Sequence, residues 1–546
     1  MTWRARAACA LALLVAAWPS TARAADPFAI RGIKGLWWEG IEKYRLALPW
    51  LQRHGMNFLM LCYSSFPASG AKWRSDYTPA EQRQIADLAR EADRRGVRLC
   101  LSFNPGIWSD PPLVYGSERD YALILRKVRA VHALGVRWFA LCLDDIGRQP
   151  TPEDAARFGT VEAAQAHLVN RLWADMRRLS PRPRLLFCPS AYTTEDMRAH
   201  MGYTRAIGTG VDREVMLFWT GPTVCSASIT AADADLVAGW LGRKPFVWDN
   251  YPVNDMFPWR PLLAPLKNRS ADLAGHVAGI LWNPMRQWHA STLPLAIAAA
   301  YARAPGAYDP LRALEAAVAE WPTADRPAVR ALLALYGTRF LGEKGYPPQP
   351  AARGREEAAR ELGRWKWVRS LLAGRPSLAP LWADVRDTLE ADIRLLERRS
   401  ADRLTRSPLR ALGDEMEGGA GDLYGYRKYG RDVNYIYAAS TGRHRLTCDF
   451  VLSGVPEGGA ALRLTARNDD FGNRPRLRIA LNGHVLFEGP SPYDSKGFAT
   501  RSFHAPASAL RSGENRLEIE CVEPAGPLGM PPWWMVAEAE LAPLTP

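Results

Sequence analysis

The sequence predicts an α/β protein in which a (β/α)8 barrel, the TIM-barrel fold, is followed by a helical bundle and a C-terminal β-sandwich. Three observations along the 546 residues support this division. Short apolar runs alternate with amphipathic stretches from about residue 30 to 300, helical periodicity replaces them from about 310, and alternating patterns begin near 410. We therefore expect a barrel at 25–305, a bundle at 306–405 and a sandwich at 406–546.

The barrel prediction depends on eight apolar runs, each bounded by polar residues, glycine or proline, as expected of strands buried on both faces. Amphipathic stretches such as Pro79–Arg95 and Val161–Leu179 separate them. A doubly wound open sheet would usually have fewer strands and a glycine-rich phosphate turn, which the sequence lacks. The runs are Gly32–Trp37, Asn57–Cys62, Arg98–Phe103, Arg137–Leu143, Arg184–Cys188, Val215–Trp219, Phe246–Asp249 and Val277–Trp282.

The second half of the chain shows helical and then strand patterns. Strand-like runs extend from His444–Leu452 to Trp534–Ala539, and Asn482-Gly483 is a typical two-residue hairpin turn. These runs predict a jelly-roll-like sandwich, which could be a carbohydrate-binding module or a structural appendage without a ligand. The helical patterns before it cover Arg312–Trp321, Pro327–Tyr336, Glu356–Leu372 and Leu381–Glu397.

The first 24 residues have the pattern of a secretory signal peptide. Arg4 and Arg6 give a positive start, residues 7–18 are apolar, and residues 22–24 form a small-x-small cleavage pattern. We expect the mature chain to begin at Ala25, in the periplasm or outside the cell. Because no apolar stretch reaches the ~20 residues of a membrane span, we expect no stable membrane insertion.

Composition and charge narrow the classes of partner. The chain has 70 Lys and Arg against 57 Asp and Glu, a net charge of +13, but the basic residues are scattered. No run of five or more basic residues occurs, so we expect a solvated surface and no nucleic-acid partner. The 21 Trp could stack on flat sugar faces, although large cores also bury Trp.

The cysteines give no sign of a metal site. No Cys-x-x-Cys or His-x-x-x-His spacing occurs, so no metal site is expected. Cys448 and Cys521 lie in separate predicted strands and could pair. Four others lie in apolar runs, where a thiol behaves as a small hydrophobic group, namely Cys62, Cys100, Cys142 and Cys188.

Two adjacent carboxylates follow the fourth apolar run. Chemistry in a (β/α)8 barrel lies at the C-terminal ends of the strands, which is where Asp144 and Asp145 occur. Two neighbouring carboxylates at the end of a buried strand repel each other, which raises the pKa of at least one and suits a general acid. A helix-capping role for one of them is the structural alternative.

Polar and aromatic residues follow several other runs as well. Asn and Asp can hold sugar hydroxyls and Trp can form an apolar wall, although Asn and Asp are also ordinary loop formers. Turn chemistry alone does not explain such residues after five strands in turn. They include Tyr192 after the fifth run, Trp219 at the end of the sixth, Trp248, Asn250 and Asp255 at and after the seventh, and Asn283 after the eighth.

Four ordered motifs carry a resemblance to a known family. Residues 30–300 resemble the β-N-acetylglucosaminidase domain of glycoside hydrolase family 84, which includes O-GlcNAc hydrolases and so-called hyaluronidases. The helical segment that follows is also similar to that family's architecture. The motifs are Leu143-Asp144-Asp145-Ile146, Trp219-Thr220-Gly221-Pro222, Trp248-Asp249-Asn250 with Asn254-Asp255, and Asn283-Pro284.

The resemblance implies a substrate-assisted retaining mechanism, in which the acetamido carbonyl of the sugar attacks C1 and forms an oxazoline. It implies that Asp144 orients and polarises the acetamido N–H, and that Asp145 is the general acid and then the general base. It also implies a set of substrate-binding residues. These are Tyr192 and Trp248 at the acetamido group, Asn250 and Asn283 at the acetamido group and ring hydroxyls, Asp255 at the 4- and 6-hydroxyls, the Gly35 carbonyl at a hydroxyl, and Trp219.

Two departures from the family pattern concern the same sugar site. The family usually has Gly-Phe-Tyr-Gly after the first strand, where this chain has Gly35-Leu36-Trp37-Trp38. After the second strand the family has a lysine that contacts the 3-hydroxyl, where this chain has Ser64, with Lys72 as the nearest replacement. Loss of that cation could weaken sugar binding or change the preferred sugar.

The sequence therefore predicts a secreted or periplasmic exo-β-N-acetylglucosaminidase that acts on terminal 2-acetamido sugars of a glycan or glycoconjugate. Such a hydrolase requires no organic cofactor either. One alternative is a glycan-binding protein with a degraded glycosidase site, and another is a glycosidase of shifted sugar specificity. The presence of the Asp144-Asp145 pair, Asn250 and Asp255 favours the enzyme, whereas the missing lysine favours the alternatives.

Overall fold

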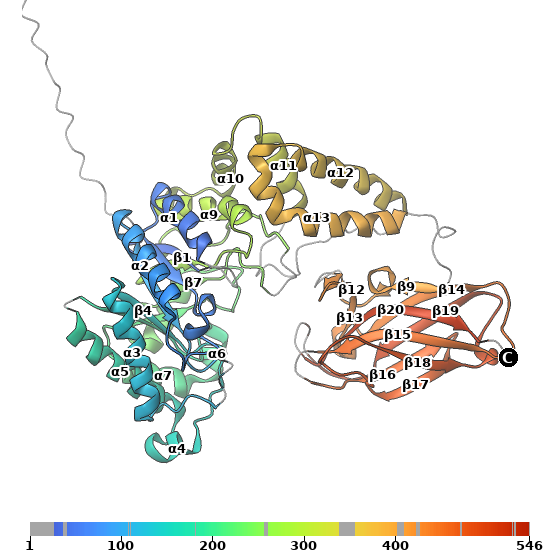
Figure 1. The fold of residues 1–546 in the computed structure, drawn as a ribbon, viewed down its shortest axis with the longest axis horizontal. Coiled ribbons are helices and arrows are strands. Elements are labelled where there is room, and N and C mark those ends of the chain that lie inside the picture. Colours follow the sequence, from blue (N-terminus) through green and yellow to red (C-terminus); the bar gives the residue numbers. More distant parts are fainter. Residues whose placement is uncertain are drawn as a thin grey trace, which may run out of the picture.

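The computed structural model describes residues 27–35, 41–107, 109, 111–180, 182–255, 260–337, 355–400, 409–421, 426–469, 472–526, 528 and 531–544. A barrel with surrounding helices, a group of long helices and a separate β-sandwich follow one another along the chain (Figure 1). The predicted signal peptide at 1–24, and Trp37 and Trp38 after the first strand, lie outside the described residues.

Eight parallel strands close into a barrel in sequence order, with β8 paired to β1, so the predicted fold class is confirmed. The close pairing of β1 with β2 requires a glycine at one position of the barrel. A Cβ at Gly32 would come within 1.8 Å of the Phe58 carbonyl oxygen, so the β1–β2 pair needs glycine there. The strands are β1 (Arg31–Lys34), β2 (Phe58–Leu61), β3 (Arg98–Phe103), β4 (Trp138–Cys142), β5 (Arg184–Cys188), β6 (Met216–Trp219), β7 (Phe246–Asp249) and β8 (Gly279–Trp282).

Helices follow the strands, and α2, α3, α4, α5, α6 and α8 begin at Ser or Thr caps. At α2 the Thr78 side chain accepts from the Glu81 N–H, and the Glu81 side chain accepts from the Thr78 N–H, which satisfies two otherwise unpaired donors. The helices are α1 (Glu42–Arg53), α2 (Pro79–Arg94), α3 (Glu118–Ala133), α4 (Pro152–Phe158), α5 (Val161–Leu179), α6 (Thr194–Ala199), α7 (Met201–Gly210), α8 (Ala231–Leu241) and α9 (Trp288–Arg303), with short 3-10 turns η1 (Tyr63–Ser65), η2 (Pro67–Ser69), η3 (Leu273–Gly275) and η4 (Pro305–Ala307).

The barrel has two apolar layers. One fills its interior and includes Cys100, Cys142 and Cys188 among larger side chains such as Phe218. The other packs the outward faces of the strands against the helices and contains Trp219. The interior layer is thus a packed core, and reactive groups can gather only at the ends of the strands.

Long helices after the barrel share a core with it. Leu262 and Met285 of the barrel loops pack in the same apolar cluster as the helices. Asp392 accepts hydrogen bonds from Arg260 of a barrel loop and from Tyr336, which fixes the two parts to each other. The helices are α10 (Pro310–Ala319), α11 (Arg326–Tyr336), α12 (Arg355–Ala373) and α13 (Ala379–Ser400), with η5 (Pro376–Leu378). Among the described residues, no helix is both long and apolar enough to cross a membrane.

Two antiparallel sheets form the C-terminal sandwich, in the orders β10-β14-β19-β16-β17 and β13-β20-β15-β18, with β9 paired to β20. Asn482 and Gly483 join β16 to β17 with φ of 53° and 81°, as the predicted hairpin turn requires. The strands are β9 (Arg410–Leu412), β10 (Glu417–Gly418), β11 (Arg427–Lys428), β12 (Arg431–Asp432), β13 (Asn434–Ile436), β14 (Arg445–Leu452), β15 (Ala460–Asn468), β16 (Arg476–Leu481), β17 (His484–Pro490), β18 (Ala499–Ala505), β19 (Gly513–Cys521) and β20 (Trp534–Pro543).

The suggested pairing of Cys448 with Cys521 is not found. Both thiols are free, and Cys448 of β14 lies opposite Leu517 of β19. Cys521 is four positions further along β19, which corresponds to ~13 Å at ~3.4 Å per residue. A disulfide requires Cα atoms within ~7 Å, so this register separates the two cysteines.

Candidate active site

The polar residues singled out in the sequence lie where the barrel strands end. Asp144 and Asp145 come directly after β4, Tyr192 follows β5, Asn250 follows β7 and Asn283 follows β8. Because parallel strands of a barrel end on one face, these side chains belong to one end of the molecule. They form a carboxylate group and an amide group.

Asp144 is the buried member of the carboxylate pair, with 6% of its surface exposed. The Tyr63 hydroxyl donates to its Oδ2 at 2.9 Å, and the Asn104 side chain donates to its backbone carbonyl at 3.2 Å. Burial, and then the charge of Asp145, raise the pKa of Asp144 from its ordinary value of 3.8 to about 6, while Lys34 and the Tyr63 hydrogen bond act in the opposite direction. The carboxyl of Asp144 therefore titrates close to neutral pH.

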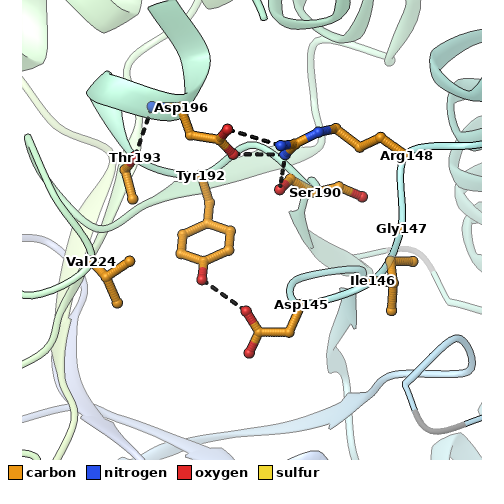
Figure 2. Close-up of a pocket in the computed structure, with 9 residues that line it drawn as sticks. All are labelled: Asp145, Ile146, Gly147, Arg148, Ser190, Tyr192, Thr193, Asp196 and Val224. Carbon is orange, nitrogen blue, oxygen red and sulfur yellow. Dashed lines mark hydrogen bonds and ion pairs between the residues drawn. The ribbon is translucent and has the colours of Figure 1, made fainter. Parts of the chain in front are cut away.

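Asp145, in contrast to the buried Asp144, has an exposed side chain. Its backbone has a φ of 57°, in the left-handed region that residues other than glycine seldom adopt. The Tyr192 hydroxyl donates to its Oδ1 at 2.9 Å, as Figure 2 shows. Burial and the Asp145 charge raise the pKa of Tyr192, so this hydroxyl stays protonated and can donate. Backbone strain at Asp145 thus separates two adjacent carboxylates into a buried one and an accessible one.

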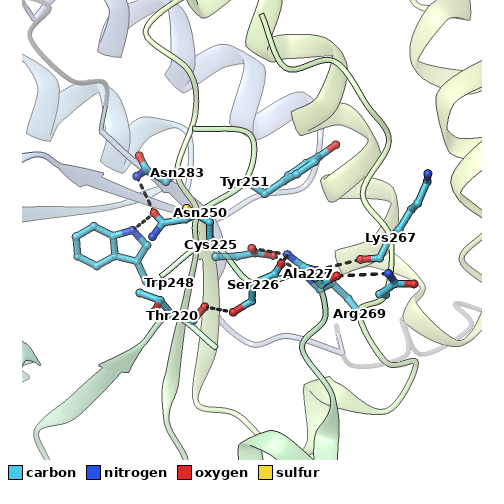
Figure 3. Close-up of polar contacts among 12 residues, drawn as sticks. Thr220, Cys225, Ser226, Ala227, Trp248, Asn250, Tyr251, Lys267, Arg269 and Asn283 are labelled. Atoms are coloured by element: carbon cyan, nitrogen blue, oxygen red, sulfur yellow. Dashed lines mark hydrogen bonds and ion pairs between the residues drawn. The ribbon is translucent and has the colours of Figure 1, made fainter. Parts of the chain in front are cut away.

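Three side chains form the amide group, namely Trp248 in β7, Asn250 after β7 and Asn283 after β8 (Figure 3). Asn250 Oδ1 accepts from Trp248 Nε1 at 3.0 Å and from Asn283 Nδ2 at 2.9 Å, and Asn250 Nδ2 donates to the Val224 carbonyl at 2.7 Å. Asn283 Oδ1 is buried and has no hydrogen-bond partner within the described part of the chain. Such an acceptor suits a hydroxyl or amide N–H of a ligand.

A buried ion pair fixes the end of β7, next to Trp248 and Asn250. Arg269 donates to both carboxylate oxygens of Asp249, at 2.9 and 2.8 Å, and each side chain is 1% exposed. The same guanidinium also donates to the Ser226 carbonyl at 3.1 Å. The pair thereby ties the end of β7 to the loop that follows β6 and holds Trp248 and Asn250 in place.

Lys34 is a site residue that sequence reasoning missed. It ends β1 and is 2% exposed, with its Nζ 4.0 Å from the centre of the Trp248 ring and 5.5 Å from that of Tyr63. It thus lies between the carboxylate group and the amide group. A cation is therefore present in the site, although it comes from the first strand, whereas the family lysine follows the second.

The remaining predicted residues differ in how they are placed. Trp219 is fully buried in the layer between strands and helices, and its Nε1 donates to Thr194, so the structure does not place it at the site. Gly35 is tightly enclosed, since a Cβ there would come within 2.1 Å of the Tyr44 hydroxyl. Asp255 is exposed in the loop after β7, and its charge acts on the thiol of Cys225.

Neither candidate for the family lysine position supplies a cation. Ser64 lies in η1, where its hydroxyl is 3.0 Å from the Cys62 sulfur. Lys72 is exposed in the turn after η2, and no contact links its side chain to the site within the described residues. Lys34 is thus the cation that the structure brings to the described site.

Replacing Asp144 with Asn should stabilise the folded protein at pH 8 and have little effect at pH 4. The folded pKa is about 6 and the ordinary value 3.8, so stability is lost as the pH rises through this interval. For this fully buried carboxyl the difference corresponds to about 3 kcal/mol, and the Asn Oδ1 can still accept from Tyr63. Thermal unfolding of both proteins at the two pH values checks this, and an equal change at both would contradict it.

Replacing Lys34 with Met should move the acid limb of the kcat/KM profile to higher pH. The Lys34 charge lowers the pKa of Asp144, so its removal leaves this carboxyl protonated over a wider pH range. Met preserves the length and apolar stem of the side chain that packs on Trp248. The measurement is kcat/KM from pH 4 to pH 9 for both proteins. An unchanged profile would show that Lys34 does not act on the carboxylate that limits turnover.

Comparison with known proteins places this geometry in a family. A model of the beta-N-acetylglucosaminidase family matches residues 29–335, more than half of the 546-residue chain. The chain belongs to this family. The predicted resemblance is therefore confirmed, and the barrel is a glycoside hydrolase domain of family 84.

Curated and solved proteins agree with this membership. Protein O-GlcNAcase of Mus musculus is 28% identical over 222 residues, which cover 40% of this chain and 24% of that protein. The chain thus covers about a quarter of the length of the curated relatives it matches. A mutant of the Thermobaculum terrenum O-GlcNAc hydrolase shares 25% identity at a TM-score of 0.60, over 68% of this chain and 84% of that chain. The solved structure of CpGH84B, at 21% identity and a TM-score of 0.58 over 68% of each chain, shows the same fold.

Proposed function

We propose that this protein is a retaining exo-β-N-acetylglucosaminidase that removes terminal 2-acetamido sugars through an oxazoline. The observation that carries the proposal is the divided carboxylate pair, in which Asp144 is buried on Tyr63 and Asp145 is accessible beside Tyr192. A mechanism without an enzyme nucleophile needs one fixed carboxylate to orient the acetamido group and one exchangeable proton donor.

In the first step the acetamido carbonyl oxygen forms a bond to C1 while the bond from C1 to the glycosidic oxygen breaks. Asp145 gives its proton to that oxygen, and the leaving group departs as an alcohol. Asp144 accepts the acetamido N–H, which orients the carbonyl and stabilises the positive charge that develops on the amide. Tyr63 and Asn104 keep Asp144 in place for this task.

In the second step Asp145 takes a proton from water. The oxygen of that water bonds to C1 on the face that the leaving group vacated, and the bond from C1 to the acetamido oxygen breaks. The two displacements together retain the β configuration. Asp145 ends protonated, ready for the next cycle.

The remaining residues have binding roles in this proposal. Trp248 provides an apolar wall for the acetamido methyl, and Tyr192 holds the acetamido oxygen once substrate replaces its contact with Asp145. Asn250 and Asn283 meet polar groups of the sugar, for which the unpartnered Asn283 Oδ1 is available. Asp255 and the Gly35 carbonyl accept ring hydroxyls.

The alternative of a degraded, glycan-binding site rested on the missing lysine. The presence of Lys34 beside Trp248 weakens that alternative, because the site has a cation after all. A glycosidase of shifted sugar specificity stays a second candidate, since the cation enters from a different strand. The names of the relatives, O-GlcNAcase and O-GlcNAc hydrolase, support N-acetylglucosamine as the sugar.

The proposed setting is the periplasm or the outside of the cell, supported by the signal-peptide pattern in the first 24 residues. The sandwich after the helices could then hold the glycan that carries the substrate sugar.

The proposal is tested by turnover of aryl glycosides by the purified mature chain. We expect hydrolysis of the aryl β-N-acetylglucosaminide, little hydrolysis of its galacto epimer, and none of the β-glucoside that lacks the acetamido group. Fast turnover of the glucoside would contradict the mechanism. Preference for the galacto epimer would favour shifted specificity, and binding of N-acetylglucosamine without any turnover would favour the glycan-binding alternative.

A further inference from the structure

A pocket of about 360 Å³ adjoins the accessible carboxylate of Asp145 (Figure 2). It shares Asp145 and Tyr192 with the site described above, but Asp144 and the amide group do not line it. The pocket therefore lies on the Asp145 side of the site. Its lining consists of Asp145, Ile146, Gly147 and Arg148 after β4, Ser190, Tyr192 and Thr193 after β5, Asp196 of α6 and Val224 after β6.

One wall of the pocket is charged. Arg148 donates from Nη1 to Asp196 Oδ2 at 2.7 Å and from Nη2 to Asp196 Oδ1 at 2.9 Å, and Nη1 also donates to the Ser190 carbonyl at 2.8 Å. These bonds leave the Nε–H and one Nη2–H of Arg148 without a partner within the described residues. His200 Nδ1 also lies 3.0 Å from Asp196 Oδ1. The Arg148 and Asp196 side chains are 28% and 30% exposed, so both charged groups are partly accessible to a ligand.

The rest of the pocket combines apolar and polar groups and has open space. Tyr192, Ile146 and Val224 provide apolar surface, and Asp145, Ser190 and Thr193 add polar groups. At Gly147 a Cβ would meet no atom within 4 Å, so this part of the loop leaves free space. A volume near the lower end of the usual range for ligand pockets fits one small polar group of the size of a sugar ring.

We propose that this pocket binds the leaving group of the substrate and is built for a hydroxylated one, a second sugar residue. The inference rests on the proposed function, because it takes Asp145 as the donor of a proton to the glycosidic oxygen. The glycosidic oxygen joins the terminal 2-acetamido sugar to the leaving group. A pocket on the Asp145 side of this oxygen therefore receives the leaving group. Adjacent hydroxyls of a sugar both donate and accept, which matches a guanidinium with free N–H groups beside a carboxylate.

The test compares kcat/KM for N,N′-diacetylchitobiose with kcat/KM for an aryl β-N-acetylglucosaminide. Arg148→Met removes the charged donors and keeps the length of the side chain. We expect it to lower kcat/KM for the disaccharide by about 10- to 100-fold more than for the aryl substrate, the effect of losing hydrogen bonds to a charged group. Gly147→Leu, which places an apolar side chain where a Cβ meets no atom within 4 Å, should shift the ratio in the same direction.

Arg171→Met is the matched control, because it breaks a similar bidentate pair with Glu118 between α3 and α5, away from the pocket. It should leave the ratio of the two rates unchanged. Equal losses on both substrates in Arg148→Met and Gly147→Leu, or a wild-type enzyme that cleaves the aryl substrate and a serine-linked glycopeptide but not the disaccharide, would overturn the inference. A wild-type protein that cleaves none of the three would instead overturn the proposed function.

Discussion

Asp145→Ala should slow hydrolysis of substrates with a sugar or serine leaving group by ~10²–10⁴, the usual contribution of a positioned general acid. An alkoxide cannot leave without a proton, so the loss falls on the first step. An activated phenolate leaves unaided, so the same variant should lose much less in that step on a nitrophenyl substrate. The measurement is kcat/KM for wild type and variant across leaving groups of different pKa.

Added azide provides a control on the same variant. Azide needs no deprotonation, so it can replace the water that Asp145 activates in the second step. It should therefore restore turnover of activated substrates by Asp145→Ala, with a glycosyl azide as the product. If rescue and leaving-group dependence occurred in Asp144→Ala, the two roles would be reversed.

Asp144→Ala should be severe on every substrate, with a loss of ~10²–10³ in kcat as expected when a preorganised electrostatic partner is removed. Its carboxylate orients the acetamido group whatever the leaving group is. The buried hydroxyl of Tyr63 would also lose its acceptor, so the site would be disturbed locally. The slope of kcat/KM against leaving-group pKa should resemble that of the wild type, and azide should not help.

The same kinetic measurements show whether the two aspartates are catalytic or structural. Tyr63→Phe is a matched control, because it removes the hydrogen bond to Asp144 and keeps the ring that packs near Lys34. Its kcat should lie between that of the wild type and that of Asp144→Ala. Losses of only a few-fold in both aspartate variants would mean that the pair is structural and that catalysis occurs elsewhere.

The barrel could be predicted from the sequence because strands buried on both faces leave continuous apolar runs, and the eight expected runs overlap the eight observed strands. Asp144 and Asp145 could be singled out because they end such a run. The sequence did not indicate which of the two is buried. That difference comes from the backbone at Asp145 and from Tyr63, which lies in the turn η1 after β2 and donates its hydroxyl to Asp144.

Residues at strand ends are harder to interpret, because a shift by one position changes the face on which a side chain lies. Trp219 belongs to a motif of the family, yet its ring packs outward against the helices and its Nε1 meets Thr194. Lys34 lies within the first apolar run, Gly32–Trp37, and the sequence pattern assigned it no role. Its burial beside Trp248 depends on the closure of β1 against β8, which no local pattern reveals.

The most direct test of the proposed mechanism is graded fluorination of the N-acetyl group in an aryl β-N-acetylglucosaminide. Each fluorine withdraws electron density from the carbonyl oxygen that is proposed to attack C1. We expect kcat/KM to fall with every fluorine, from acetyl through fluoroacetyl and difluoroacetyl to trifluoroacetyl. A series of equal or rising rates would show that the acetamido group is not the nucleophile, and would contradict substrate-assisted catalysis at Asp144 and Asp145.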